Sequence, residues 1–198
     1  MDPVEGNQEV DVLLAGIPQS ANRLGSPSAP VALEFFGDLQ CPFSRKFALQ
    51  VLPAIIQRWV RAGDLGISYC ALQTATREPE VFLSQQVAAL AAGRQDYAWH
   101  FIETFYREQG RENSGYVTDA YLQGIASQIP GLSLSEWSSD RSEQELAREI
   151  AADEQVAERA GLNGTPSFLI GRGSSAMTVF SPSDPTSFAT AIEGLLVP

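Results

Sequence analysis

Hydrophobic positions in the first half of the chain change period twice, which predicts a strand, a helix and a second strand. The run VALEFF at 31–36 is apolar and has the length of a strand. From Pro42 onward, apolar side chains recur every fourth residue, as on one helix face, at Phe43, Phe47, Val51 and Ile55. Pro53 should kink this helix near its middle. The segment LGISYCALQ at 65–73 predicts the second strand, and a strand–helix–strand unit of this size favours parallel pairing.

The middle of the chain, from about 80 to 160, shows helical spacing only. Its clearest apolar stripes consist of Ala98, Phe101, Ile102 and Phe105, and of Tyr121, Leu122 and Ile125. Ser142 with Glu145 predicts a capping box that opens the last helix of this block. Gly161 should end that helix.

The end of the chain returns to strand patterns and finishes with a helix. PSFLI at 166–170 and AMTVF at 176–180 flank a glycine-containing turn, which predicts a β-hairpin. Asp184 and Pro185 suit the cap and first turn of a final helix. The apolar face of that helix consists of Phe188, Ile192 and Leu195. The order β-α-β, helical block, β-β-α indicates an α/β protein with a helical insertion.

The composition and net charge of the chain argue against several classes of function. The chain has 198 residues and a net charge of −11, which argues against binding to nucleic-acid phosphates. No apolar run reaches the roughly 18–20 residues that a membrane-spanning helix needs. The acidic start MDPVEGNQEV is no signal peptide, so we expect either a cytoplasmic protein or an extracytoplasmic one whose export segment was removed. Two cysteines and one histidine are too few for a disulfide framework or a zinc site, and we expect no metal or cofactor.

The segment DLQCPFSRK at 38–46 carries the strongest chemical signal. Cys41 lies between a predicted strand end and a helix start, where free backbone N–H groups and the helix dipole stabilise a thiolate. Arg45 and Lys46 add positive charge in the first helical turn, and the Ser44 hydroxyl could face the sulfur. This pattern indicates a nucleophilic cysteine. The alternative is a small buried apolar side chain.

Three segments resemble the DsbA-like thiol–disulfide oxidoreductases, which have a thioredoxin-like fold with an inserted helical lobe. LGSPSAPVALEFFGDLQCPFSRKF at 24–47 is similar to the active-site region of that family. GLNGTPSFLIG at 161–171 resembles its cis-proline loop, and AGRQDYAWHFIETFYREQ at 92–109 its helical lobe. The resemblance covers the chain from about Ile17 to the final helix.

The resemblance implies a domain plan and a set of site residues. Residues 31–78 and 161–198 would form the thioredoxin-like domain, and 79–160 the inserted helical lobe. Independently of the resemblance, Pro18, Gly25, Pro27 and Pro30 disfavour regular structure and predict an extended N-terminal arm over 1–30. Cys41 would attack substrate disulfides. Thr165 and Pro166, joined by a cis bond, would face it and bind the substrate backbone, and Pro42 and Phe43 would contact substrate.

Two positions depart from the family pattern. The second cysteine of the family is Ser44 here, and the buried acid six residues before the first cysteine is Phe35. Glu34 is one position away and should point to the opposite face of its strand. Asp38 could supply the missing acid, although a solvated loop carboxylate is the simpler interpretation. Because acid and sulfur are lost together, we interpret Ser44 as natural rather than engineered, and Cys41 as a catalytic thiol that works alone.

Several alternatives remain open. Cys70 could be a displaced resolving thiol, although a packed core position is the simpler interpretation, and His100 should be an exposed residue without a catalytic role. The predicted function is thiol–disulfide exchange on protein or peptide substrates, as an isomerase, a reductase or a mixed-disulfide carrier. An external thiol or redox partner would release each mixed disulfide. The alternatives are a glutathione-using transferase or isomerase of the same fold, and a redox-inactive peptide-binding, chaperone-like module.

Overall fold

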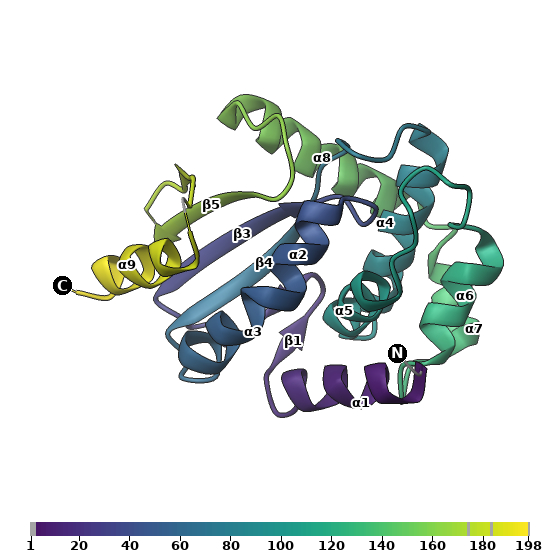
Figure 1. Ribbon diagram of the computed structural model, residues 1–198, viewed down its shortest axis with the longest axis horizontal. Coiled ribbons are helices and arrows are strands. Elements are labelled where there is room, and N and C mark those ends of the chain that lie inside the picture. Colours follow the sequence, from purple (N-terminus) through teal and green to yellow (C-terminus); the bar gives the residue numbers. More distant parts are fainter. Residues whose placement is uncertain (1–2, 174, 183, 198) are drawn as a thin grey trace.

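A central mixed sheet organises the molecule, whose computed structural model describes residues 3–173, 175–182 and 184–197 (Figure 1). Its strand order is β1-β2-β4-β3-β5-β6. The strands are β1 Gln19–Ser20, β2 Arg23–Leu24, β3 Val31–Gly37, β4 Leu65–Ala71, β5 Ser167–Arg172 and β6 Thr178–Phe180. β3 and β4 pair in parallel, and β5 pairs antiparallel with both β3 and β6. The predicted parallel unit and the predicted hairpin are both confirmed.

One face of the sheet is covered by the helices that follow β3 and end the chain. These are α2 Pro42–Gln50, α3 Leu52–Ile55, the π-helical η1 Ile56–Val60 and α9 Pro185–Leu196. Phe35 of β3 lies 4.8 Å from Phe47 of α2, and Phe47 lies 5.5 Å from Phe188 of α9, measured between ring centroids. The predicted break near Pro53 is confirmed: α2 ends at Gln50 and Pro53 lies in the first turn of α3. The Asp184 carboxylate caps α9 as predicted.

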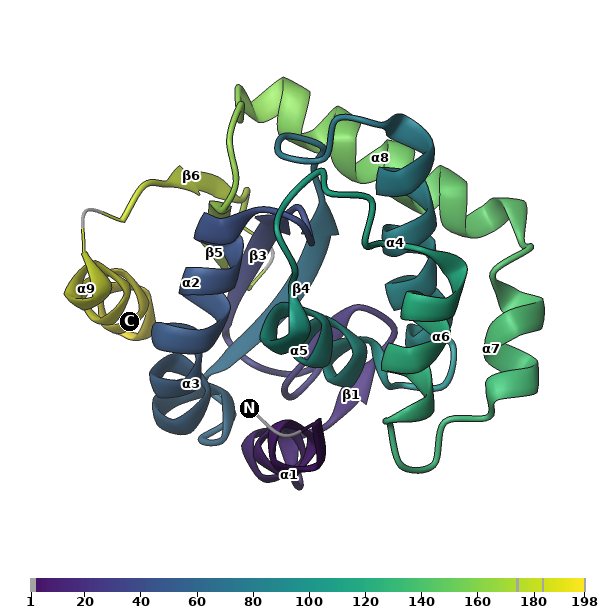
Figure 2. The same ribbon diagram turned by 45° about the vertical axis from the view of Figure 1, so that its right-hand side comes forward.

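The helical block follows β4 and lies beside the sheet (Figure 2). It consists of α4 Pro79–Gly93, α5 Ala98–Glu108, α6 Asp119–Ser127, α7 Leu134–Asp140 and α8 Gln144–Ala160. The predicted stripe of α5 is buried, and Phe101 stacks on Trp137 of α7 at 6.2 Å. α8 reaches back to the other face of the sheet, where Ala157 packs against Phe36 and Cys70.

The end of α8 follows the prediction and its start does not. Gly161 closes the helix in the left-handed conformation, with φ of 70°. The predicted capping box of Ser142 and Glu145 is wrong, because the helix begins at Gln144 after Glu143 and no side chain caps it. The N–H groups of Ser142 and Glu143 instead continue the turn that ends α7.

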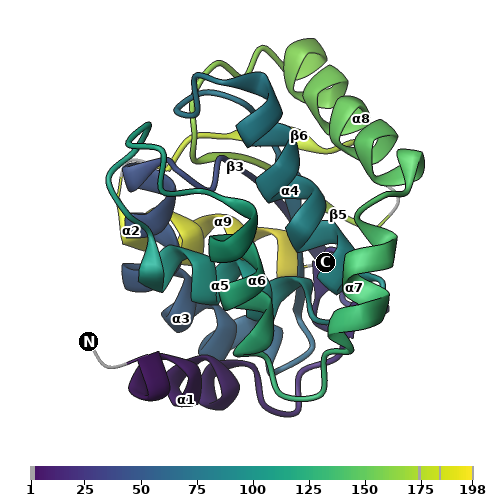
Figure 3. The same ribbon diagram turned by 90° about the vertical axis from the view of Figure 1, so that its right-hand side faces the viewer.

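The expected extended arm over 1–30 is wrong, because it contains the helix α1 Pro3–Leu14 and the short strands β1 and β2. The buried side chains Val10, Leu13, Leu14 and Ile17 have the i, i+3, i+4, i+7 spacing of a helix face. α1 packs across α5 (Figure 3). Arg61 binds the end of α1 through the backbone carbonyls of Val12, Leu13 and Ala15.

α1 also covers the polar side of α5, so the prediction that His100 is exposed is wrong. Only 15% of the His100 side chain is exposed, and its Nδ1 lies 3.1 Å from Nε2 of Gln19. Glu103, one turn later, is fully buried against Arg107. Burial raises the pKa of Glu103 to about 7.

None of the helices in the described part of the chain has both the length and the apolar character of a membrane span.

Candidate functional site

Cys41 occupies the N-cap of α2, at the end of the loop that leaves β3. Its backbone is extended, its carbonyl accepts the N–H of Arg45 at 3.0 Å, and no side chain caps the helix. The Cys41 thiol donates to the carbonyl oxygen of Thr165 at 3.2 Å and is 4% exposed. An anionic sulfur at this point would face the positive end of the helix dipole.

Ser44 lies in the same helical turn but does not bind the Cys41 sulfur. It is fully buried, and its hydroxyl has no hydrogen-bond partner among the described residues. It lies beside the hydroxyl of Tyr106, which belongs to a buried pair with Tyr69. No hydrogen bond joins the Ser44 hydroxyl to the Cys41 sulfur within the described chain, so the expected support of a thiolate by Ser44 stays a prediction.

β3 places an aromatic ring, not a carboxylate, on the side of the sheet that carries α2. Phe35 is fully buried and lies 5.4 Å from Tyr69 and 5.7 Å from Phe168, measured between ring centroids. Glu34 points to the opposite face, as expected from strand alternation, and burial raises the pKa of its carboxyl group. Phe35 therefore adds packing, and no proton-accepting group, beneath the site.

Asp38 is fully buried, so its interpretation as a solvated loop carboxylate is wrong. Its Oδ2 accepts the N–H groups of three successive loop residues, Thr74, Ala75 and Thr76, at 3.1, 2.9 and 2.8 Å. Its Oδ1 accepts from the Gln40 N–H, the Thr76 hydroxyl and the Gln85 amide. Asp38 thus fixes the loop after β4 against the loop that carries Cys41.

The fixed loop reaches the predicted cis-proline segment. The Thr165–Pro166 bond is cis, as predicted. The hydroxyls of Thr74 and Thr165 are hydrogen-bonded, and Ser167 follows directly as the first residue of β5. Gln109, from the end of α5, donates to the carbonyls of Leu39 and Cys41 at 2.7 and 3.2 Å.

A groove of about 570 Å³ runs from the start of α2 to α9 and includes Pro166. Phe43 lies at its rim, and 68% of this aromatic residue is exposed. Lys46 and Asp184 are its charged lining residues. The remaining lining residues are Phe47, Gln50, Val51, Phe168, Pro182, Pro185 and Phe188. An apolar groove with few polar groups is a suitable surface for a polypeptide segment.

Cys70 lies on the sheet face that α8 covers, opposite the face that carries α2. It pairs with Phe36 in the β3–β4 register and is 7% exposed. Burial raises the pKa of the Cys70 thiol well above its usual value, and the nearby Asp153 carboxylate raises it further. Both cysteines are free thiols.

The structure thus brings Cys41 together with Thr165 and Pro166, and it places Pro42 and Phe43 on the surface beside them. Sequence reasoning missed the roles of Asp38, Thr74 and Gln109 in fixing this arrangement. Asp38 offered one signal, since a carboxylate directly after a buried strand often accepts backbone N–H groups of a neighbouring loop. Thr74 and Gln109 carried no signal, because their partners lie far away in the sequence.

Comparisons with known proteins agree with this fold. The sequence model of the family described as Thioredoxin matches residues 19–193. Among curated proteins, the probable disulfide bond formation protein D of Bacillus anthracis is 22% identical over 148 residues, which cover 74% of this chain and 68% of the relative. The crystal structure of oxidised BdbD from Bacillus subtilis superposes with a TM-score of 0.77 at 19% identity, over 92% of this chain and 98% of that chain. DsbA2 of Pseudomonas aeruginosa gives a TM-score of 0.69 at 22% identity, over 91% and 96% of the two chains.

Proposed function

Because this chain belongs to the thioredoxin family, we propose that it carries out thiol–disulfide exchange on protein or peptide substrates through Cys41 alone. One observation carries the proposal: the Cys41 thiol stands at an uncapped helix N-terminus against the Thr165 carbonyl, with a serine at the position of a second sulfur. The relatives named for disulfide bond formation and the DsbA-type fold support the general chemistry.

The exchange needs two steps. The Cys41 thiolate attacks one sulfur of a substrate disulfide, so that a new S–S bond forms and the other substrate sulfur leaves as a thiolate. Ser44 has no sulfur with which to displace the bound substrate. An external thiolate must therefore attack the mixed disulfide, take over the substrate sulfur and release the Cys41 thiolate. This favours isomerase, reductase or carrier activity over net oxidation.

The groove gives the substrate a place to lie. In this proposal Thr165 and Pro166 contact the substrate backbone, and Pro42 and Phe43 offer exposed apolar surface at the rim. Ser44, which is buried in the first turn of α2, has no sulfur and takes no part in electron transfer. Since such exchange needs disulfide-containing substrates, an extracytoplasmic location belongs to the same proposal.

The test counts covalent adducts by intact mass after mixing the reduced protein with a peptide that contains one disulfide. We expect one peptide per chain, bound to Cys41, and stable until glutathione is added. Ser44→Cys should shorten the life of the adduct and accumulate an internal disulfide. Cys41→Ala should form no adduct.

Cys70→Ala is the matched control, because Cys70 lies on the opposite sheet face and should not alter the wild-type result. If the unmodified protein releases its adduct without an external thiol, and Cys70→Ala abolishes the release, then Cys70 is the resolving thiol and the monothiol mechanism is wrong. If no adduct forms at all, the redox-inactive peptide-binding module becomes the better interpretation.

A further inference from the structure

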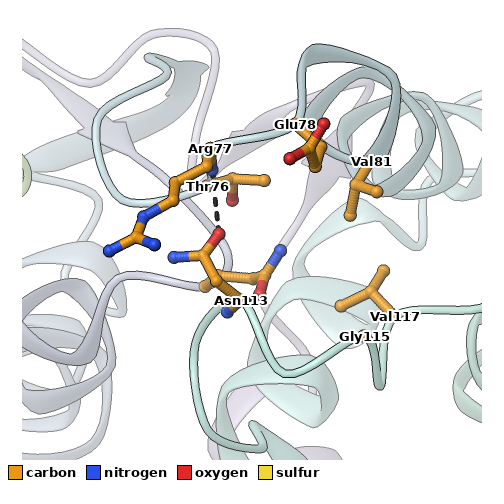
Figure 4. Close-up of a pocket in the computed structure, with 8 residues that line it drawn as sticks. Thr76, Arg77, Glu78, Val81, Asn113, Gly115 and Val117 are labelled. Atoms are coloured by element: carbon orange, nitrogen blue, oxygen red, sulfur yellow. Dashed lines mark hydrogen bonds between the residues drawn. The ribbon is translucent and has the colours of Figure 1, made fainter.

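A second cavity of about 220 Å³ is lined by Gln40, the residue before Cys41, and by residues of the helical block (Figure 4). It is enclosed by the loop after β4, the first turn of α4 and the loop between α5 and α6. Its lining residues are Gln40, Thr76, Arg77, Glu78, Val81, Asn113, Gly115 and Val117. None of these residues belongs to the groove beside α9.

The floor of this cavity is held in place by Asn113, whose backbone has a positive φ of 55°. The Asn113 side chain accepts the N–H of Arg77 and donates to the carbonyl of Ala75, both at 2.9 Å. The Asn113 N–H donates to Oε1 of Gln40, also at 2.9 Å. Asn113 thus joins its own loop to the loop after β4 and to Gln40, in the loop before α2.

Gln40 gives the cavity an unused donor. Its side chain is 3% exposed and lines the cavity, and its Nε2 donates to no acceptor among the described residues. This Nε2 group is not among the buried unsatisfied polar atoms of the described chain, so it is accessible from the cavity. A carbonyl oxygen of a bound polypeptide can accept a hydrogen bond from it.

The walls combine apolar and acidic character. Val81 and Val117 supply apolar surface, and the exposed Glu78 forms no ion pair within the described chain. In Figure 4 the Glu78 side chain stands on the same side as Val81, whereas the Arg77 guanidinium extends away from both valines. The site therefore offers an apolar wall that ends in an unpaired carboxylate.

We propose that this cavity binds a lysine or arginine side chain of the substrate polypeptide, close to the disulfide that Cys41 attacks. The aliphatic part of such a side chain would lie against the valines while its cationic end meets Glu78. The net charge of −11 favours the approach of cationic segments. The proposal rests on the proposed function and adds to it a preference for basic substrates.

The position of the cavity suits this role. Gln40 directly precedes Cys41, and the loop that contains Thr76 and Glu78 also contains Thr74, which is bonded to Thr165. A chain that crosses Thr165 can reach the groove beside α9 with one end and this cavity with the other.

The test uses disulfide-containing peptides that differ in one residue, placed in turn at each of three positions on either side of the cysteine. The rate of adduct formation on Cys41 is measured for lysine, alanine and glutamate. At one of these positions we expect the lysine peptide to react about three- to fivefold faster than the alanine peptide, which is the size of effect that exposed ion pairs give. The glutamate peptide should react more slowly than the alanine peptide. Glu78→Gln should reduce the lysine-to-alanine ratio to about one, and Glu78→Lys should invert it.

Glu80→Gln is the matched control, because it removes an equal charge from the same helical turn at a residue that does not line the cavity. It should keep the lysine preference. Equal rates for lysine and alanine at every position would overturn the inference and leave the proposed function intact. A preference that Glu80→Gln removes as fully as Glu78→Gln would also overturn it, since general surface charge would then be the cause. Failure of every peptide to form an adduct would instead contradict the proposed function.

Discussion

Cys41 and Cys70 are buried to a similar extent, but they differ in the charges that surround their thiols. Cys41 is 4% exposed and Cys70 is 7% exposed, so exposure alone does not distinguish them. Cys41 meets the positive end of a helix. Cys70 meets the carboxylates of Asp153 and Glu34, which disfavour a second negative charge. At the scale of single residues, the electrostatic surroundings therefore favour Cys41 over Cys70 as the reactive thiol of the proposed exchange.

Alkylation measures this difference directly. We expect iodoacetamide at pH 6–7 to modify Cys41 at least about tenfold faster than Cys70, because only the thiolate reacts and burial raises the pKa of the Cys70 thiol. Mass mapping of the labelled peptides over a time course gives both rates from one sample. Equal and slow labelling of the two cysteines would remove the chemical basis of the monothiol proposal.

At the scale of elements, α8 connects the helical block to the sheet through Asp153. Its carboxylate accepts the N–H of Ala71, at the end of β4, at 2.9 Å. Burial raises the pKa of Asp153 from 3.8 to about 6, and Glu34 opposes its ionisation as well. The Ala71 hydrogen bond favours the ionised carboxylate, but burial and Glu34 outweigh it, so ionisation near neutral pH destabilises this junction between α8 and β4.

The sign of the resulting pH effect follows from linkage. The native state holds the Asp153 proton more tightly than the unfolded state, so its contribution to stability is complete below about pH 4 and is lost as the pH rises through about 6. Asp153→Asn keeps an acceptor for the Ala71 N–H and removes the titration. In denaturant unfolding from pH 4 to 7, the free energy of unfolding should therefore decline by about 2 kcal/mol less in Asp153→Asn than in the wild type. A parallel pH dependence of the two proteins would contradict this assignment.

The elements themselves could largely be predicted from the sequence. The spacing of apolar residues gave β3, the broken helix after Cys41, β4 and the stripe of α5, because each buries one regular face. Val10, Leu13, Leu14 and Ile17 have the spacing of a helix face, which would have predicted α1. The prolines and the glycine between 18 and 30 favoured an extended arm instead. His100 was misplaced as a consequence, because α1 is the element that covers it.

At the scale of the whole molecule, the candidate site is a meeting point of distant segments. The loop before α2, the loop after β4, the end of α5 and the segment before β5 converge on Cys41. The sequence indicated the first and last of these through the motifs around Cys41 and Pro166. The other two could not be predicted, because a threonine or a glutamine in a loop has no distinctive pattern and acquires its role only from tertiary contacts.

The hydrogen bonds from the loop after β4 to Asp38 should slow the exchange of the loop's amide protons with solvent. Loop amides usually exchange with solvent quickly, because local opening costs little. Here the N–H groups of Thr74, Ala75 and Thr76 all donate to one buried carboxylate, so their release requires that a charged group lose several partners at once. In D₂O, NMR should show these three amides exchanging as slowly as those of β4, and Asp38→Asn should speed all three together. The segment that borders both candidate binding surfaces would then be as rigid on the time scale of hours as the sheet itself, and substrates would meet a preformed edge.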